Sequence, residues 1–122
     1  MIMNFDVAII GSGLAGVYLA LTLSSEFKVA LFSEGGYKDT NSYLAQGGIA
    51  ASVGRHDSSR AHYQDTMQCG HHTNNKSAVI QLTQDALTEI KRLEHFGVAF
   101  DRTASNDYHL GTEGAHRCAR VL

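Results

Sequence analysis

The feature that most constrains the fold is a glycine-rich turn near the N-terminus. The turn has the pattern GxGxxG and consists of Gly11, Ser12, Gly13, Leu14, Ala15 and Gly16. It follows an apolar run at residues 6–10, which is typical of a strand buried on both faces of a parallel sheet. After it come an apolar segment at residues 16–23, which we expect to be helical, and a second apolar run, Val29–Phe32. This order predicts a βαβ unit.

Each glycine of the turn has a physical role in binding a dinucleotide. The first permits the tight turn, the second lets the backbone approach a pyrophosphate, and the third lets the helix pack closely on the strand. The helix N-terminus offers free N–H groups and the positive end of its dipole to the phosphates. Because the turn lies between a strand and a helix, we expect its six residues to bind a dinucleotide cofactor.

A side chain at the end of the second strand is expected to contact the ribose of that cofactor. The fingerprint places an acid about twenty residues beyond the turn, and Glu34 follows Gly16 by 18 positions. Either Ser33 or Glu34 could face the ribose, depending on where the strand ends. Alternatively, Glu34 is a solvated surface carboxylate.

A second constellation lies in the glycine-rich stretch at residues 34–54, which predicts irregular backbone close to a ligand. It continues through Ile49, Ala50 and Ala51, and its cofactor-binding candidates are Asn41, Ser42, Tyr43, Leu44, Ala45, Gln46, Gly47 and Gly48. The string closely resembles the S-x-x-A-Q-G-G-I-A-A segment of the succinate dehydrogenase, fumarate reductase and L-aspartate oxidase flavoproteins. The resemblance implies that FAD is the cofactor and that this segment holds its ribityl chain and ring system.

A third constellation resembles the L-aspartate oxidase branch of that superfamily. Asp65-Thr66 and Cys69-Gly70 correspond to its D-T-x-x-A-G segment, and residues 109–117 correspond to its L-x-R-E-G-[GA]-H segment. The resemblance implies that Glu113 meets the amino group of the substrate and that His116 helps to form the pocket. A carboxylate is a suitable partner for an ammonium. A purely structural, hydrogen-bonded role for His116 stays open.

Three positions depart from the usual pattern of that branch. Thr112 replaces a frequent arginine, Ala115 a frequent glycine, and Glu34 a frequent lysine. The change at Thr112 affects the charge of the substrate pocket, and the change at Glu34 leaves open how the ribose is held. Neither change removes a residue on which FAD binding depends.

Farther along, residues 77–96 carry apolar side chains at spacings of three and four, which predicts an amphipathic helix. Ser77 is the expected N-cap and Gly97 the expected left-handed residue after the helix. We expect a polar segment at residues 55–65, a short strand at residues 98–100 and a loop or hairpin at residues 102–110.

The composition excludes several classes of function. The 122 residues are 43% hydrophobic and 18% charged, with a net charge of −2, so we expect neither nucleic-acid nor membrane binding. The N-terminus lacks the features of a secretory signal, which favours a cytoplasmic location. The cysteines Cys69 and Cys118 are expected to be ordinary thiols, and no metal site is expected, even at the adjacent His71 and His72.

The expected fold class is therefore α/β, with residues 1–122 forming the incomplete N-terminal part of a Rossmann-like FAD-binding domain. A sheet of so few parallel strands would leave long edges unpaired, which indicates a fragment of a larger chain. The family's capping and helical domains, with the His and Arg residues that bind the substrate carboxylates and take a proton, are then expected beyond residue 122. The fragment alone is expected to be inactive.

The resemblance implies oxidation of L-aspartate to iminoaspartate, with hydride transfer to FAD and reoxidation by oxygen or fumarate. The product would feed quinolinate and de novo NAD synthesis, with quinolinate synthase as a candidate partner. Three alternatives remain open: a fumarate reductase or succinate dehydrogenase flavoprotein subunit, a non-enzymatic NAD-binding module, and a gene fragment without function.

Overall fold

The computed structural model describes residues 2–122. The chain divides into two compact units, Met1–Gly47 and Gly48–Leu122. In the described part of the chain, no helix is both long and apolar enough to cross a membrane.

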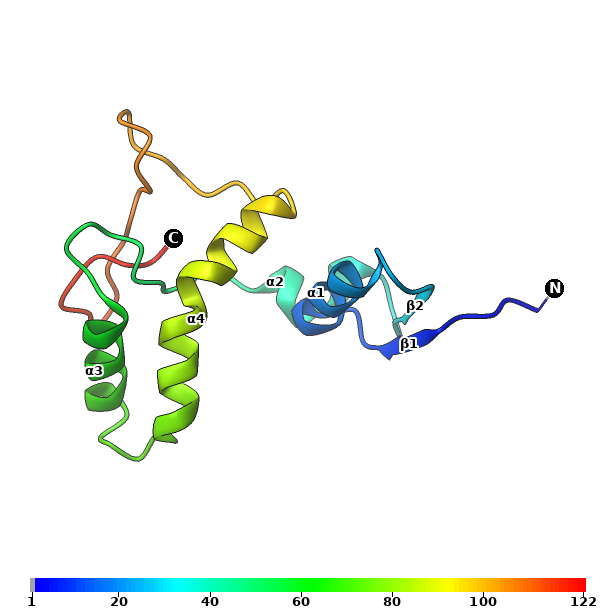
Figure 1. Cartoon of the computed structure of the whole chain (residues 1–122), viewed down its shortest axis with the longest axis horizontal. Coiled ribbons are helices and arrows are strands. Elements are labelled where there is room, and N and C mark those ends of the chain that lie inside the picture. The colour runs from blue at the N-terminus through cyan, green and yellow to red at the C-terminus, as the bar shows by residue number, and fades with distance from the viewer. Residues whose placement is uncertain (1) are drawn as a thin grey trace. The chain divides into compact units, whose positions relative to one another are not determined.

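The first unit is built on a βαβ arrangement, as the sequence predicts. Strand β1 (Val7–Ile10) is followed by helix α1 (Leu14–Leu23) and strand β2 (Val29–Phe32). The two strands pair in parallel, with Val7 opposite Val29 and Ile10 opposite Phe32 (Figure 1). Helix α1 begins two residues earlier than expected, inside the glycine-rich turn, so its N-terminus lies next to the backbone of Gly13.

At two positions of the turn, Gly11 and Gly16, any other residue would be strained or would clash. Gly11 has a φ of 105°, a conformation that L-residues with a Cβ rarely adopt. A Cβ at Gly16 would overlap the carbonyl oxygen of Gly11 and contact the side chain of Ile9. The strand end, the turn and the first turn of α1 therefore pack against one another as the fingerprint requires.

The stretch after β2 is more regular than expected. It contains a 3-10 helix, η1 (Tyr37–Asp39), and a four-residue helix, α2 (Asn41–Leu44). The hydroxyl of Thr40 caps α2 by accepting a hydrogen bond from the backbone of Tyr43 at 3.2 Å. Such local capping lets a glycine-rich, polar segment form single helical turns, and the expectation of wholly irregular backbone at residues 34–54 was wrong here.

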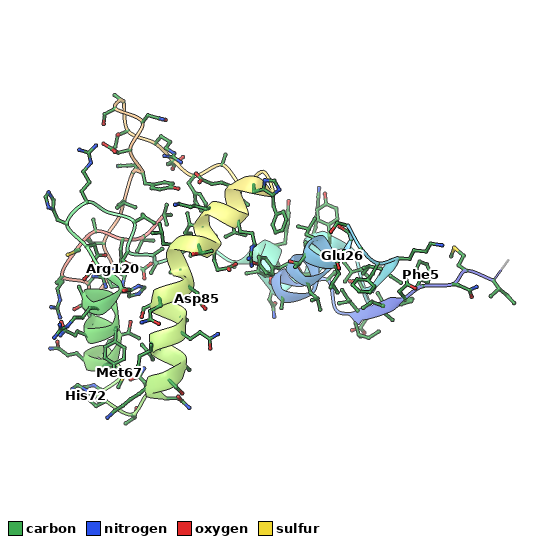
Figure 2. The ribbon with its side chains drawn as sticks, in the orientation of Figure 1. Phe5, Glu26, Met67, His72, Asp85 and Arg120 are labelled. Carbon is green, nitrogen blue, oxygen red and sulfur yellow. The ribbon has the colours of Figure 1, made fainter. Side chains whose placement is uncertain are left out.

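The second unit contains two helices that lie side by side, α3 (Ser59–Cys69) and α4 (Lys76–His95) (Figure 1). Its apolar core consists of Ala51, Met67, Val79 and Ile90, all at most 9% exposed. Figure 2 marks Met67 on α3. The polar segment expected at residues 55–65 is helical from Ser59 onward. The helix begins there because the Ser58 hydroxyl caps α3 by accepting a hydrogen bond from the backbone of Ala61.

Helix α4 confirms the expected amphipathic helix, but with a different cap. Asn75, and not Ser77, accepts the capping bond from the backbone of Ala78 at 3.2 Å, and Ser77 lies inside the helix. Asparagine and serine are about equally good caps, so the residue type alone does not distinguish the two positions. At the other end Gly97 has the expected positive φ, 96°. The backbone of Val98 bonds to Leu93 at 3.0 Å, which completes a Schellman motif.

The region after α4 has no strand at residues 98–100, contrary to expectation. The N–H of Val98 already caps α4, and a strand needs a neighbour with which to pair. Residues 102–110, expected to form a loop or hairpin, form a loop closed by one antiparallel bridge between Arg102 and Tyr108. Val121 forms bridges with both Ala50 and Gly111, so the C-terminal residues run beside the start of this unit.

Candidate functional site

In the first unit the glycine-rich turn borders a hollow of about 400 Å³. Six of its nine lining residues belong to the cofactor candidates, namely Ser12, Gly13, Leu14, Ser42, Tyr43 and Ala45. The other three, Val17, Tyr37 and Thr40, were not expected. The rings of Tyr37 and Tyr43 meet edge to face, with centroids 5.6 Å apart. The hollow thus combines apolar and aromatic side chains with a few hydroxyl and backbone groups, a lining that is typical of small-molecule sites.

Hydrogen bonds join three separate segments around this hollow. The N–H of Leu14, at the start of α1, donates to the hydroxyl of Ser42 at 2.9 Å. The hydroxyls of Ser12 and Ser33 lie 2.7 Å apart. The first turn of α1 carries no acidic residue, so no carboxylate opposes an anion at the helix N-terminus. A pyrophosphate is therefore physically compatible with this position.

The remaining cofactor candidates lie elsewhere in the described chain. Gly11, Ala15 and Gly16 shape the turn without lining the hollow, and Ser33 contacts it only through Ser12. Glu34 is exposed, and so are Asn41, Leu44, Gln46 and Gly47. Gly48 belongs to the second unit, where a Cβ would overlap the carbonyl oxygen of Leu122. Of the two ribose candidates, Ser33 is joined to the glycine-rich turn through the Ser12 hydroxyl, and no side-chain bond joins Glu34 to that turn in the described chain.

The second unit gathers the third constellation around one hollow of about 360 Å³. Residues far apart in the sequence meet here: the C-terminal half of α3 and the turn that contains Glu113 and His116. The lining consists of Asp65, Thr66, Cys69, Gly70, Asn74, Glu113, Gly114, Ala115 and His116. The two motifs that resemble the L-aspartate oxidase branch therefore form the walls of a single pocket.

The turn at residues 113–116 is closed by two reciprocal hydrogen bonds. The N–H of His116 donates to the carbonyl of Glu113 at 3.1 Å, and the N–H of Glu113 donates to Nδ1 of His116 at 3.4 Å. Ala115 has a φ of 69°, so the departure from glycine at this position falls on a left-handed residue. The Glu113 side chain is exposed and free to meet a ligand in the hollow.

Beside this pocket lies a cluster of four charged side chains, in which Asp57, Asp65 and Arg120 are buried and Arg117 is half exposed. Arg120 is fully buried (0% exposed) and binds Asp57 through two nitrogens, at 2.9 and 3.0 Å. Its Nη1 lies 3.0 Å from Asp65. Asp65 also accepts the backbone N–H of Arg117 at 3.1 Å and its Nε at 2.6 Å. Two cations and two anions balance, which is the condition for burying them.

The cluster affects the pKa values of two buried residues, Asp65 and His62. Burial raises the pKa of Asp65, but the hydrogen bonds and charge of Arg117, with the charge of Arg120, outweigh it and hold that pKa below its ordinary value. The buried His62 packs edge to face against His116, with ring centroids 6.1 Å apart. Its burial, and next the charge of Arg120, lower the pKa of His62. His62 is therefore neutral at neutral pH.

Sequence reasoning named Asp65 only as part of a motif and did not identify Asp57, His62 or Arg120. A signal was present in the spacing of one pair. His62 and Asp65 are three positions apart, and residues three apart share one face of a helix. This pair lies on α3, and without the expectation of that helix the spacing had no meaning.

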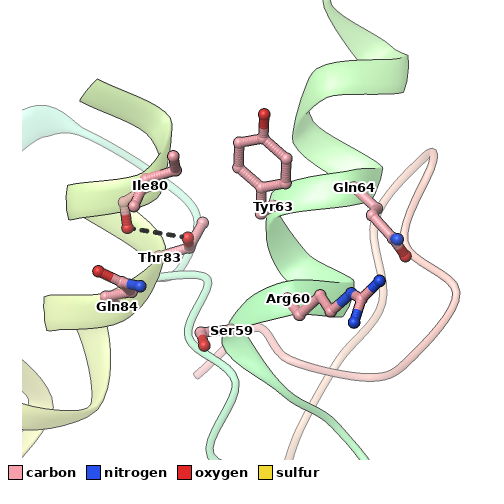
Figure 3. A pocket seen from close by; sticks show the side chains of 7 residues that line it. All are labelled: Ser59, Arg60, Tyr63, Gln64, Ile80, Thr83 and Gln84. Carbon is pink, nitrogen blue, oxygen red and sulfur yellow. Dashed lines mark hydrogen bonds between the residues drawn. The ribbon is translucent and has the colours of Figure 1, made fainter. Parts of the chain in front are cut away.

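The two hollows that border α4 contain none of the candidate site residues. One, of about 400 Å³, lies between α3 and α4 and includes Tyr63, Arg60 and Thr83 (Figure 3). The dashed bond in Figure 3 joins the Thr83 hydroxyl to the carbonyl of Ile80 at 3.2 Å. The other, of about 660 Å³, is an apolar groove along α4 whose lining includes His62. Among residues 2–122, no three potential metal ligands are grouped suitably for a metal ion.

Both cysteines are free thiols, as expected. His71 and His72 have positive φ values of 49° and 60°. The N–H of His72 donates to the carbonyl of Met67 at 2.8 Å, so this pair forms the C-terminal turn of α3.

A family model described as "FAD binding domain" matches residues 6–122. The chain belongs to the FAD binding domain family. This membership confirms the α/β fold class and the expectation that FAD is the cofactor, and it disfavours a simple NAD-binding module.

Two similar proteins are both named L-aspartate oxidase. The chain is 38% identical over 117 residues to the L-aspartate oxidase of Halalkalibacterium halodurans, covering 96% of this chain and 23% of that protein. It is 42% identical over 119 residues to the L-aspartate oxidase of Synechocystis sp., with coverages of 98% and 21%. The chain thus spans less than a quarter of the length of these relatives.

Solved structures agree on the fold. The Mycobacterium smegmatis Sdh1 complex in the apo form superposes with a TM-score of 0.86 at 29% identity, covering 96% of this chain and 20% of that one. An E. coli quinol fumarate reductase gives a TM-score of 0.86 at 27% identity, covering 98% of this chain and 21% of that one. The resemblance to both branches of the superfamily is therefore confirmed at the level of sequence and fold.

Proposed function

We propose that this chain is the N-terminal part of the FAD-binding domain of an enzyme that oxidises L-aspartate to iminoaspartate. The observation that carries the proposal is the pocket of about 360 Å³, in which Glu113 and His116 face the Asp65-Thr66 and Cys69-Gly70 motifs. The relatives named L-aspartate oxidase, at 38% and 42% identity, support it.

FAD binding is assigned to the first unit and to the segment that follows it. The N-terminus of α1 would receive the pyrophosphate, with the hydroxyl of Ser42 beside it, and Ser33 would bind the ribose. The absence of space for a Cβ at Gly16 supports this assignment, because that close packing is what the fingerprint glycine provides. Gln46, Gly47 and Gly48 are proposed to approach the ring system. FAD, when bound, supplies the hydride acceptor that no side chain can replace.

The role of the second unit is to bind and orient the amino group. In the reaction L-aspartate loses a hydride from Cα and a proton from its ammonium, which leaves protonated iminoaspartate. The Glu113 carboxylate is proposed to hold the ammonium and so to orient Cα. His116 is proposed to fix the Glu113 turn through its Nδ1 and to border the substrate. Oxygen or fumarate would reoxidise the cofactor, and quinolinate synthase would take the product toward NAD in the cytoplasm.

A steady-state assay of the gene product that carries this chain tests the proposal. We expect turnover of L-aspartate and little of succinate. Glu113→Gln removes a charged partner worth about 1.5–3 kcal/mol, so the KM for L-aspartate should rise roughly 10- to 100-fold. Glu26→Gln, at an exposed glutamate of the first unit marked in Figure 2, should change nothing. Equal KM values for Glu113→Gln and wild type would contradict the assignment.

A second candidate function follows from the solved structures. Similarity to the Sdh1 complex and to the quinol fumarate reductase favours interconversion of succinate and fumarate. Turnover of succinate without turnover of L-aspartate in the same assay would select this function.

A further inference from the structure

We propose that Asp65 is a positioning residue, whose buried carboxylate holds the Glu113–His116 turn in the orientation that receives the substrate. This inference depends on the proposed function, because the orientation of the turn matters only if the turn binds substrate. Asp65 is not assigned a contact with substrate itself.

The geometry first shows that Asp65 is attached to the backbone of the turn. Its Oδ2 accepts the N–H of Arg117 at 3.1 Å, directly after His116. Its Oδ1 accepts Nε of the same residue at 2.6 Å. Both oxygens of one carboxylate thus bind one residue, which fixes its backbone in position and direction.

The Asp65 carboxylate is in turn held by the buried side chain of Arg120. Asp65 is 5% exposed, and Nη1 of the fully buried Arg120 lies 3.0 Å from Oδ2. Arg120 is locked by its two-nitrogen pairing with Asp57. A rigid second layer of this kind is what fixes a ligand-binding group, since a displacement of about 1 Å can reduce a rate by about 100-fold.

The Glu113–His116 turn depends on the bonds between Asp65 and Arg117. Glu113 to Ala115 are exposed, and Ala115 has a φ of 69° that does not favour alanine. Within the turn, Glu113 and His116 are joined by bonds of 3.1 and 3.4 Å, so they move together. The attachment at Arg117 therefore sets the direction of both side chains. On its other side, His116 packs against the buried His62.

The test uses the whole flavin-loaded gene product with two variants. Asp65→Asn keeps the size of the side chain and removes its charge. Arg117→Gln removes the Nε contact at a side chain that is 48% exposed, so it does not endanger folding. Asp107→Asn is the matched control, because Asp107 pairs with Arg55 at the surface, where the side chains are 50% and 80% exposed.

The steady-state result separates positioning from general damage. We expect kcat/KM for L-aspartate to fall roughly 10- to 100-fold in Asp65→Asn and by a smaller factor in Arg117→Gln, mainly through KM. The affinity for FAD and its absorption spectrum should equal those of wild type, and Asp107→Asn should match wild type throughout. An unchanged KM in folded Asp65→Asn would overturn the proposal. If that variant does not fold, an unchanged KM in Arg117→Gln would overturn it.

A second measurement does not depend on aspartate turnover. Trypsin cleaves after arginine, so brief digestion followed by mass spectrometry reports how firmly the backbone at Arg117 is held. Cleavage after Arg117 should be at least several-fold faster in Asp65→Asn than in wild type and Asp107→Asn. Equal rates in all three would show that Asp65 does not hold the turn. A wild-type protein without aspartate turnover would instead refute the proposed function.

Discussion

At the scale of single residues, two small residues, Gly16 and Ala115, determine whether the candidate sites can form. The backbone of Gly16 lies against Gly11, and no space for a Cβ remains between them. Ala115, in contrast, carries a Cβ in a left-handed conformation, with a φ of 69°. The first position cannot accept a methyl group, whereas the second would be more stable without one.

Gly16→Ala should therefore weaken both the fold and FAD binding. Overlap with the Gly11 carbonyl forces α1 away from the turn, at a cost of about 1–3 kcal/mol. Urea denaturation of the gene product, with a parallel titration of FAD into the apoprotein, measures both effects. Gly114→Ala is the control, since a Cβ there meets nothing within 4 Å. If Gly16→Ala and Gly114→Ala behaved alike, the close-packed turn would be wrong.

Ala115→Gly should stabilise the protein by about 0.5–1 kcal/mol, because the cost of a left-handed alanine exceeds the added freedom of glycine in the unfolded chain. The midpoint of urea denaturation measures the gain. A lower midpoint than that of wild type would mean that Ala115 is not left-handed in solution.

His62 gives a prediction about pH. Its pKa in the folded state is lowered, mainly by burial, from an ordinary value of 6.5, so the unfolded chain binds a proton at a higher pH than the folded chain does. The contribution of His62 to stability is present above pH 6.5 and declines as the pH falls toward the folded pKa. His62→Gln should remove this part of the pH dependence, while His109→Gln, at an exposed histidine, should retain it. The measurement is the urea midpoint of each variant at several pH values. The same dependence of the midpoint on pH in His62→Gln and wild type would contradict the role given to His62.

At the scale of elements, helix α3 connects the candidate substrate pocket to the core. Its polar side carries His62 and Asp65 toward the charged cluster, and Met67 packs in the apolar core at 3% exposure. The cluster balances two arginines against two aspartates, and Arg120, the fully buried member, is shared by both carboxylates, so its removal leaves buried charges without their partner.

Arg120→Met should accordingly destabilise the protein by about 3–5 kcal/mol, because it leaves Asp57 and Asp65 buried without their shared cation. Arg55→Met, at an exposed surface pair, should cost less than about 1 kcal/mol. Thermal denaturation of the two variants side by side provides the measurement. Equal losses would show that the cluster is not buried in solution.

How far the elements follow from sequence depends on the signal that each one carries. The β1–α1–β2 order and the length of α4 follow from apolar periodicity and glycine positions, and both were confirmed. Helix α3 was not expected, because most of its side chains are polar and it is held by the Ser58 cap, by packing of Met67 in the core and by pairing of Asp65 with Arg117 and Arg120. Likewise, residues 98–100 have strand-like composition, but no neighbouring strand pairs with them. Contacts between distant residues cannot be read from local patterns.

At the scale of the whole molecule, each unit contributes one half of the proposed chemistry. The first provides the glycine-rich turn and the hollow beside it, and the second provides the Glu113–His116 turn over its buried charges. The glycine-rich turn and the motif resemblance predicted both candidate sites, whereas the charged cluster beside the second became visible only in the folded chain.

The most direct test is anaerobic mixing of the flavin-loaded gene product with L-aspartate or succinate while the visible flavin absorption is recorded. Loss of the absorption band reports hydride transfer to the cofactor without dependence on the electron acceptor. We predict loss of the band with L-aspartate and none with succinate over the same time. A colourless protein, or a band that succinate removes and L-aspartate does not, would contradict the proposed function.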